Sequence, residues 1–309
     1  MRPVREVHMA SNRWWAYQRE RFPVWRHGFL IAAVCFGVLT FSIPAGDVRR
    51  IALAGRWAAA FATVFLFFLQ LRIADEFKDY EEDRRCRPHR PVPRGLVKLG
   101  ELKAIAAAAA ALQLGLALWV SPRLLLPLAA VWAYMLLMAR EFFAPAWLKR
   151  HVVIYLLSHT LVLPLIYVYV SACGWFAMGQ PPPSGLGFLL AFGFFSGLVV
   201  EIGRKIWAPA DEIPGVQTYS RLWGYKAATG VWAAVVLGAS LFLLFAAGRY
   251  GSTAPLLGLI AVLGAAGLPG VRRFMMLAQH RDAERIERLS GIFALMTHVG
   301  LGLTVWVNR

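Results

Sequence analysis

Charged residues and cysteines are both scarce in this chain of 309 residues. Asp, Glu, Lys and Arg make up 16% of it, and the acidic residues number 17 against 33 basic ones. The three cysteines, Cys35, Cys86 and Cys173, have no paired spacing, so neither a disulfide framework nor a zinc site is indicated. With 59% hydrophobic residues and a mean hydropathy of +0.55, the composition excludes an ordinary soluble domain and indicates an integral membrane protein.

The N-terminal segment also lacks the pattern of a cleavable signal peptide. Its first 28 residues contain no continuous apolar core, and aromatic side chains such as Trp14, Trp15 and Trp25 stand among arginines. Such a composition is typical of a helix that lies in the membrane interface. We therefore expect an interfacial or cytoplasmic segment, residues 1–28, followed by one membrane domain, residues 29–309.

Nine apolar stretches, with approximate limits, are candidates for crossing a hydrocarbon core about 30 Å thick, which takes about 20 helical residues. They are residues 29–43, 51–73, 102–120, 124–138, 152–173, 185–200, 227–247, 253–268 and 289–307. Because lipid offers no water to satisfy backbone polar groups, each stretch is expected to be a helix. The sequence therefore predicts an all-α bundle of nine transmembrane helices.

The excess of basic residues, a formal charge of +16, is distributed unevenly between the loops. If the N-terminus is cytoplasmic, the inner segments hold all but six of the 33 Lys and Arg residues. The outer six are Arg49, Arg50, Arg56, Arg123, Arg249 and Arg309. This asymmetry favours an N-in, C-out topology in the inner membrane, and it explains the basic charge without nucleic acid.

Two of the inner loops, residues 72–102 and 201–224, are long and rich in charge. In the first, Asp75, Asp79 and Asp83 follow one another at intervals of four residues, which places three carboxylates on one face of a helix continuing from the second span. Their repulsion would be relieved by magnesium, which prefers one or two carboxylates together with water and phosphate oxygens. A magnesium-bridged diphosphate would be a natural ligand, but for a charge run taken alone a solvated helix with ordinary ion pairs is the commoner explanation.

Residues 75–95 resemble the first signature of the UbiA-type intramembrane prenyltransferases, in the register of the chlorophyll-synthase branch. That signature reads Asn-Asp-x-x-Asp-x-x-x-Asp followed by Arg-Pro-x-x-x-Gly. The matching residues here are Asp75, Glu76, Asp79 and Asp83, then Arg90, Pro91 and Gly95. The first two depart from the family's Asn and Asp but still offer oxygen ligands. The resemblance implies that the four acids hold magnesium, with Asp79 and Asp83 catalytic, and that Arg90 binds diphosphate.

The second acidic signature of that family is only partly present in residues 201–224. The residues in register are Asp211, Gly215, Gln217, Thr218 and Gly224. By the resemblance, Asp211 would hold a second magnesium, and Glu201 or Glu212 is a candidate for a further ligand of that ion. By charge alone, Arg204 and Lys205 could neutralise diphosphate oxygens directly. An ordinary charged turn is the alternative.

A third, weaker similarity lies at the start of the fifth span, where residues 145–150 are close to the family's Tyr-Pro-x-x-Lys-Arg. Lys149 and Arg150 would bind diphosphate in the enzyme interpretation, or lipid headgroups otherwise.

Other ionisable residues in or beside the spans invite a structural explanation. For His159 and His298 we favour packing over catalysis. Arg140 and Glu141 are expected to pair with each other.

The resemblance implies a nine-helix bundle around a central cavity and an enzyme that uses Mg²⁺. Magnesium-assisted loss of diphosphate from an allylic prenyl chain would let that chain alkylate an aromatic or other lipophilic acceptor. The partners implied are an isoprenoid diphosphate, the acceptor and the bilayer, with the active-site loops on the cytoplasmic side. Transfer to a sugar or lipid alcohol, cyclisation without an acceptor, and a transporter or non-catalytic membrane protein remain as alternatives.

Overall fold

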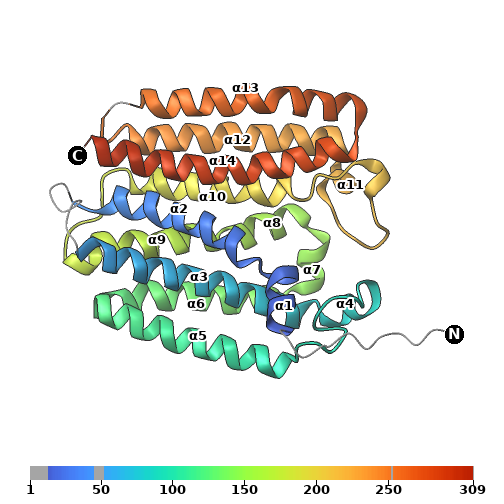
Figure 1. Ribbon diagram of the computed structural model, residues 1–309, viewed down its shortest axis with the longest axis horizontal. Coiled ribbons are helices and arrows are strands. Elements are labelled where there is room, and N and C mark those ends of the chain that lie inside the picture. The colour runs from blue at the N-terminus through green and yellow to red at the C-terminus, as the bar shows by residue number, and fades with distance from the viewer. Residues whose placement is uncertain (1–12, 45–51, 252, 309) are drawn as a thin grey trace.

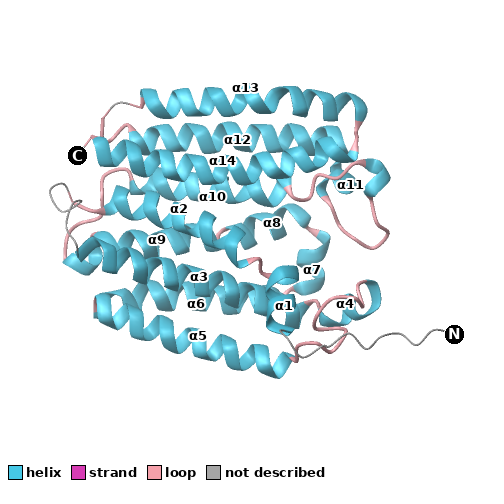
Figure 2. Ribbon diagram, viewed as in Figure 1, coloured by secondary structure: helices cyan, strands magenta, loops and turns pink. Residues whose placement is uncertain are grey.

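A computed structural model describes residues 13–44, 52–251 and 253–308, and all regular elements within these ranges are helices (Figures 1 and 2). The α-helices are α1 (Arg13–Arg21), α2 (Val24–Ser42), α3 (Ala52–Lys78), α4 (Tyr80–Cys86), α5 (Leu99–Val120), α6 (Leu125–Ala139), α7 (Pro145–Arg150), α8 (Val152–Thr160), α9 (Val162–Gly174), α10 (Leu186–Gly203), α11 (Tyr219–Trp223), α12 (Tyr225–Ala247), α13 (Ala254–Leu277) and α14 (His280–Val307). Short 3-10 turns occupy Pro122–Leu124, Glu141–Phe143, Phe176–Met178 and Pro209–Asp211. Residues 1–12 of the predicted N-terminal segment, and Arg49, Arg50 and Arg309 of the predicted outer arginines, lie outside the described residues.

The described residues contain nine helical segments long and apolar enough to cross a membrane, which confirms the predicted number. They are Val24–Ser42, Ala54–Lys78, Leu99–Val120, Pro122–Ala139, Val152–Met178, Leu186–Gly203, Tyr225–Ala247, Ala254–Leu277 and His280–Val307. Each overlaps one predicted stretch. The largest difference is in the last, because α14 begins at His280 and carries a charged first part that hydropathy alone excludes from a span.

The long helices lie side by side in one bundle (Figure 1). α10, α12, α13 and α14 pack together in one half, and α3, α5, α6 and α9 in the other, with α2 contacting α14, α9 and α3. The crossing of α2 and α14 is close at Gly37, where an added Cβ would lie 2.5 Å from the carbonyl oxygen of His298. Only a residue without a side chain allows this approach.

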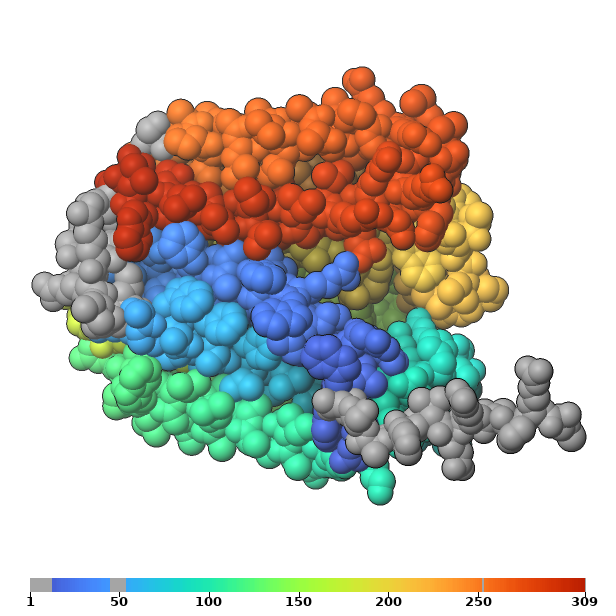
Figure 3. Space-filling model, viewed as in Figure 1, coloured from blue at the N-terminus to red at the C-terminus, as the bar shows by residue number. Residues whose placement is uncertain are grey.

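The short helices gather at one end of the bundle. Figure 1 shows α1, α4, α7 and α11 at the end opposite the C-terminus, so both charged loops share that end. On the face shown in Figure 3 the surface is recessed between α2 and α14 towards this end, and yellow-coloured chain is visible at greater depth. We call the end that carries these four short helices the loop end.

Candidate functional site

The acid-rich segment follows a helical path that is interrupted once. α3 ends at Lys78, and Asp79 has φ −93° and ψ 3° before α4 begins at Tyr80. The backbone N–H of Asp79 still donates to Asp75 O (2.9 Å), and that of Asp83 to Asp79 O (2.8 Å). The predicted continuous helix is therefore broken at Asp79, although the spacing of one helical turn between the acids survives.

Two of the four acids are buried and neutralised by arginines. Glu76 and Asp83 are 2% and 1% exposed. Arg21 of α1 donates from Nε to Glu76, and its terminal nitrogen lies 3.8 Å from Asp83 Oδ2. Asp83 also accepts from Arg90 at 2.5 and 2.7 Å and from Arg87 at 3.2 Å. These contacts fasten α1 and the loop after α4 to the acid-rich segment.

The remaining two acids, Asp75 and Asp79, have no cation held tightly against them, and we call them the open acids. The Asp75 side chain is 44% exposed and lies 3.5 Å from Arg72, at the limit of a hydrogen bond. The Asp79 carboxylate makes no hydrogen bond or ion pair with any described residue. Burial and then the neighbouring Asp75 carboxylate raise the pKa of Asp79, although Lys78 opposes them. Burial and the neighbouring carboxylate therefore both act against the charged form of Asp79.

These open acids suit magnesium by their chemistry, because they are hard oxygen donors whose mutual repulsion a cation would remove. In the part of the chain that the structure describes, no three His, Cys, Asp or Glu side chains are already gathered as a metal site. A site with two carboxylates agrees with the preference of magnesium to complete its shell with water and phosphate oxygens.

In the second charged loop, basic residues outnumber the acid beside them. Glu201, in the last turn of α10, lies 2.5 Å from Arg204 and 3.0 Å from Lys205. Asp211 instead accepts from His280 Nδ1 at 2.8 Å, at the start of α14. This acid is thus tied to a different element.

Glu212 is engaged as well, because both of its carboxylate oxygens accept from the Thr218 hydroxyl, at 2.6 and 2.8 Å. None of the three acids of this loop is therefore without a partner.

The two charged loops lie at the same end of the bundle (Figure 1). Burial lowers the pKa of Arg204, but the Glu201 and Asp75 carboxylates outweigh burial, and the pKa is raised. Lys205 lies 5.5 Å from the Tyr219 ring centre, and its backbone oxygen accepts from the Tyr219 N–H. Asp75 is thus one of the charges that act on Arg204.

The two basic residues of the third similarity, Lys149 and Arg150, take no part in these contacts. Lys149 and Arg150 are exposed at the end of α7, and the Arg150 side chain donates only to the backbone oxygen of Ala146 among described residues. Both lie at the loop end, but the structure gives neither a contact with the acid-rich segment.

A buried polar cluster beside the site was not predicted. Glu141 lies 2.8 Å from Lys78 and 3.4 Å from His159, so the predicted pairing of Glu141 with Arg140 is wrong. Arg140 fails as the partner because a left-handed turn directs Glu141 into the bundle, where it is 5% exposed. Lys78 also donates to the Tyr155 hydroxyl at 2.7 Å, and the Tyr155 and His159 rings stack at 3.9 Å.

His298 has a packing role of the kind predicted. It is 1% exposed, its Nε2 contacts the Tyr167 hydroxyl, and its Nδ1 lies 2.5 Å from the carbonyl oxygen of Ala294. The contact with Tyr167 joins α9 to α14.

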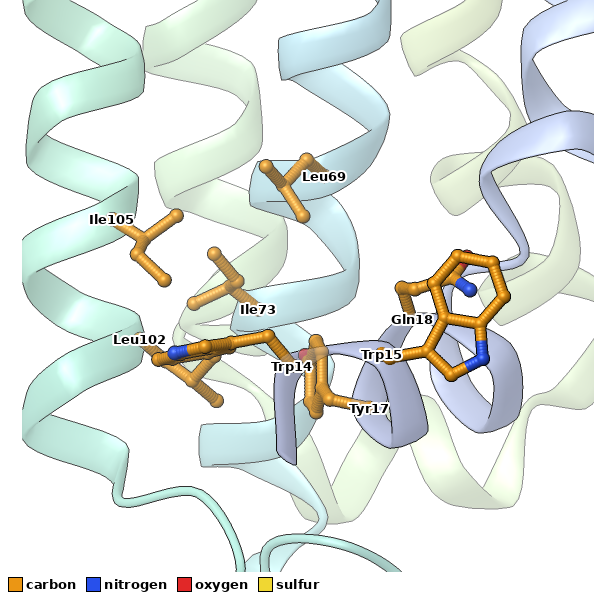
Figure 4. Close-up of a pocket in the computed structure, with 8 residues that line it drawn as sticks. All are labelled: Trp14, Trp15, Tyr17, Gln18, Leu69, Ile73, Leu102 and Ile105. Atoms are coloured by element: carbon orange, nitrogen blue, oxygen red, sulfur yellow. The ribbon is translucent and has the colours of Figure 1, made fainter. Parts of the chain in front are cut away.

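A pocket of about 350 Å³ lies between α1, α3 and α5 (Figure 4). Its walls are formed by Trp14, Trp15, Tyr17, Gln18, Leu69, Ile73, Leu102 and Ile105. No acidic residue lines it, so it does not coincide with the candidate metal site.

A family model described as the UbiA prenyltransferase family matches residues 30–296. Three solved structures have the same fold. An apo UbiA homologue from Aeropyrum pernix K1 is 17% identical with a TM-score of 0.65, covering 91% of this chain and 97% of its own. A structure of digeranylgeranylglyceryl phosphate synthase is 20% identical with a TM-score of 0.60, covering 96% and 98%. A UbiA homologue from Archaeoglobus fulgidus, bound to DMAPP and Mg²⁺, is 16% identical with a TM-score of 0.51, covering 94% and 99%. No curated protein matches this chain.

Proposed function

The chain belongs to the UbiA prenyltransferase family, and we propose that it transfers a prenyl group from an isoprenoid diphosphate to an aromatic or other lipophilic acceptor. Prenyl transfer within the membrane is the activity of this family, and the nine apolar helices agree with it. The Archaeoglobus fulgidus homologue was solved with DMAPP, an isoprenoid diphosphate, and Mg²⁺. That combination supports Mg²⁺ as the cofactor here.

The observation that carries the proposal is the pairing of open acids with nearby cations at the loop end. Asp75 and Asp79 have no cation held tightly against them, and the loop that carries Arg204 and Lys205 lies at the same end of the bundle (Figure 1). A metal-bound diphosphate has the complementary charges, since its metal suits the acids and its oxygens suit the cation.

We assign Asp75 and Asp79 as the principal magnesium ligands, with Asp79 closest to the chemistry. Bound magnesium would neutralise charge on the diphosphate and so favour its departure. Glu76, Asp83 and Asp211 were also predicted to bind metal. To do so, each would have to leave the arginine or histidine that now holds it.

The cations are assigned to the diphosphate. As the allylic C–O bond breaks, its electron pair stays on the diphosphate and the prenyl carbon bonds to the acceptor. The proton that the acceptor loses passes to the released diphosphate or to water. Arg204 and Lys205 would stabilise the departing charge, sharing their donors with Glu201. Lys149 and Arg150 are exposed on α7 and could contact the outer oxygens of the diphosphate. Arg90 is held by Asp83, so its main role would be to support that acid, and it would contact the diphosphate only if it left Asp83.

We further propose that the loop end faces the cytoplasm from the inner membrane, with the chain N-in and C-out. The support is the concentration of Lys and Arg in the segments that meet at this end. Exposed Cys86, in α4, offers the test. It should react with a membrane-impermeant maleimide in inverted vesicles and not in intact cells, and the reverse pattern would overturn the topology.

Purified protein in nanodiscs, given radiolabelled geranyl, farnesyl or geranylgeranyl diphosphate, tests the activity. With Mg²⁺ it should bind one of these and release pyrophosphate when an acceptor is supplied, and EDTA should abolish the release. Indifference to all three diphosphates, with no effect of EDTA, would favour a transporter or non-catalytic membrane protein.

The acceptor assay separates the remaining alternatives. A phenol, a naphthol and a lipid alcohol should be supplied in parallel with a reaction lacking any acceptor. A prenylated phenol or naphthol supports the proposed reaction. A prenylated alcohol or an acceptor-free cyclic product would assign the chain to one of the other two reactions.

A further inference from the structure

A strained turn adjoins the candidate metal site. Glu141, Phe142 and Phe143, between α6 and α7, have φ values of 47°, 52° and 60°. Three consecutive left-handed residues are unfavourable when none of them is glycine, because each Cβ then lies too close to the following carbonyl oxygen. Such a turn persists only where surrounding contacts hold it, and strain of this kind often marks a functional position.

The turn places the Glu141 carboxylate against Lys78. Glu141 Oε1 lies 2.8 Å from Lys78 Nζ, which also donates to the Tyr155 hydroxyl at 2.7 Å and lies 5.2 Å from the centre of that ring. The second oxygen of Glu141 faces His159 Nε2 at 3.4 Å. Burial alone would raise the pKa of Glu141, but His159 and Lys78 outweigh it and lower that pKa. Glu141 is therefore the anion that holds the Lys78 ammonium.

The position of Lys78 gives this contact its importance. Lys78 directly precedes Asp79 and is three residues after Asp75, a spacing at which a lysine and an aspartate on one helix can pair. A released ammonium could therefore pair with Asp75, and its flexible stem would also let it approach the adjacent Asp79, where the helix is interrupted. Of the four acids that match the family signature, Asp75 and Asp79 are the two not already tied to Arg21 or Arg90.

We propose that Glu141 is a positioning residue, held by the left-handed turn so that it keeps Lys78 away from Asp75 and Asp79 and leaves both acids available to the metal. The inference rests on the proposed function for the identity of the metal–diphosphate ligand. It assigns Glu141 and Lys78 no contact with the substrate.

The test measures binding of Mn²⁺, as a spectroscopic probe for Mg²⁺, by electron paramagnetic resonance with inorganic pyrophosphate present. Glu141→Gln keeps the size of the side chain and removes its charge, so it should weaken Mn²⁺ binding by about fivefold, the scale of one competing ion pair. Adding Lys78→Met removes the competitor and should restore binding to near the wild-type value. Arg140→Gln, at the exposed neighbouring position, should have no effect.

Glu141→Gln also leaves the Lys78 cation without its partner, and Lys78→Met relieves that cost too, so the thermal melting temperature is measured beside binding. Weaker Mn²⁺ binding in a Glu141→Gln protein that keeps the wild-type melting temperature distinguishes positioning from a general structural role. Unchanged binding in Glu141→Gln, or an unrepaired loss in the double variant, overturns the inference. If Glu141→Gln does not fold, Lys78→Met alone decides: equal or tighter binding supports the inference, and weaker binding overturns it. If the wild-type protein binds no Mn²⁺, the proposed function fails and the inference with it.

Discussion

The end of α3 and the end of α10 both place acids beside basic residues, yet they leave opposite charges available. After α3, arginines neutralise the buried acids Glu76 and Asp83, and Asp75 and Asp79 stay open. After α10, one acid, Glu201, is shared by Arg204 and Lys205. Under the proposed function this difference becomes a division of labour: we propose that the acid-rich segment after α3, the acidic half of the site, holds the metal. The loop after α10, the basic half, would supply fixed cations.

The strongest test of the acidic half is Asp79→Asn, which removes an open carboxylate with little change in shape. We expect pyrophosphate release to fall about a thousandfold, because metal-assisted charge neutralisation is lost. Glu81→Gln, an exposed acid two residues away, is the matched control and should retain activity. Full activity in Asp79→Asn would remove this residue from the metal site.

The buried acids of the same segment, Glu76 and Asp83, can be tested through the stability of the folded protein. Arg21→Gln leaves Glu76 without its cation and weakens the support of Asp83, so it should destabilise the protein by about 3 kcal/mol. Thermal unfolding in detergent measures the loss, and Arg19→Gln, exposed on the same helix, is the control. A melting temperature equal to that of the control would show that α1 does not fasten the acid-rich segment.

The basic half predicts a smaller effect on binding. Arg204→Gln should raise the KM for the prenyl diphosphate about tenfold, because one charge-assisted contact to the diphosphate is lost. Arg221→Gln is the control, since this exposed residue of the same loop contacts the backbone oxygen of Ile213. A loss confined to kcat would place Arg204 in a different role.

The smallest effect is expected at Asp211. Because His280 holds its carboxylate, Asp211→Asn should change activity by no more than about threefold, the scale of an exposed ion pair. Steady-state kinetics over a range of Mg²⁺ concentrations provides the measurement. A loss as large as that of Asp79→Asn would indicate a second metal in this half and remove the contrast between the halves.

The sequence was sufficient for the membrane fold and for the first acidic motif. Continuous apolar stretches predicted nine spans because each must bury its own backbone hydrogen bonds in lipid, and all nine are present in the described residues. The interval of four residues between Asp75, Asp79 and Asp83 likewise reflects local helix geometry. Features of this kind depend on neighbours in the chain.

The partners of the charged groups could not be read from the sequence in the same way. Arg21 and Glu76 are 55 residues apart, and Asp211 and His280 are 69 apart, so only the folded bundle brings them together. Glu141 has an arginine beside it, which made the local pair the simpler prediction. A left-handed turn is normally signalled by glycine or asparagine, and no such residue marks the turn that redirects Glu141.

The most direct test of the division of labour is the number of metal ions bound per chain. Purified protein should be titrated with Mn²⁺ in the presence of a non-hydrolysable prenyl diphosphate analogue, with bound and free metal counted by electron paramagnetic resonance. One tightly bound ion per chain, lost in Asp79→Asn and kept in Asp211→Asn, is the predicted result. Two ions of similar affinity, one of them lost in Asp211→Asn, would contradict the account.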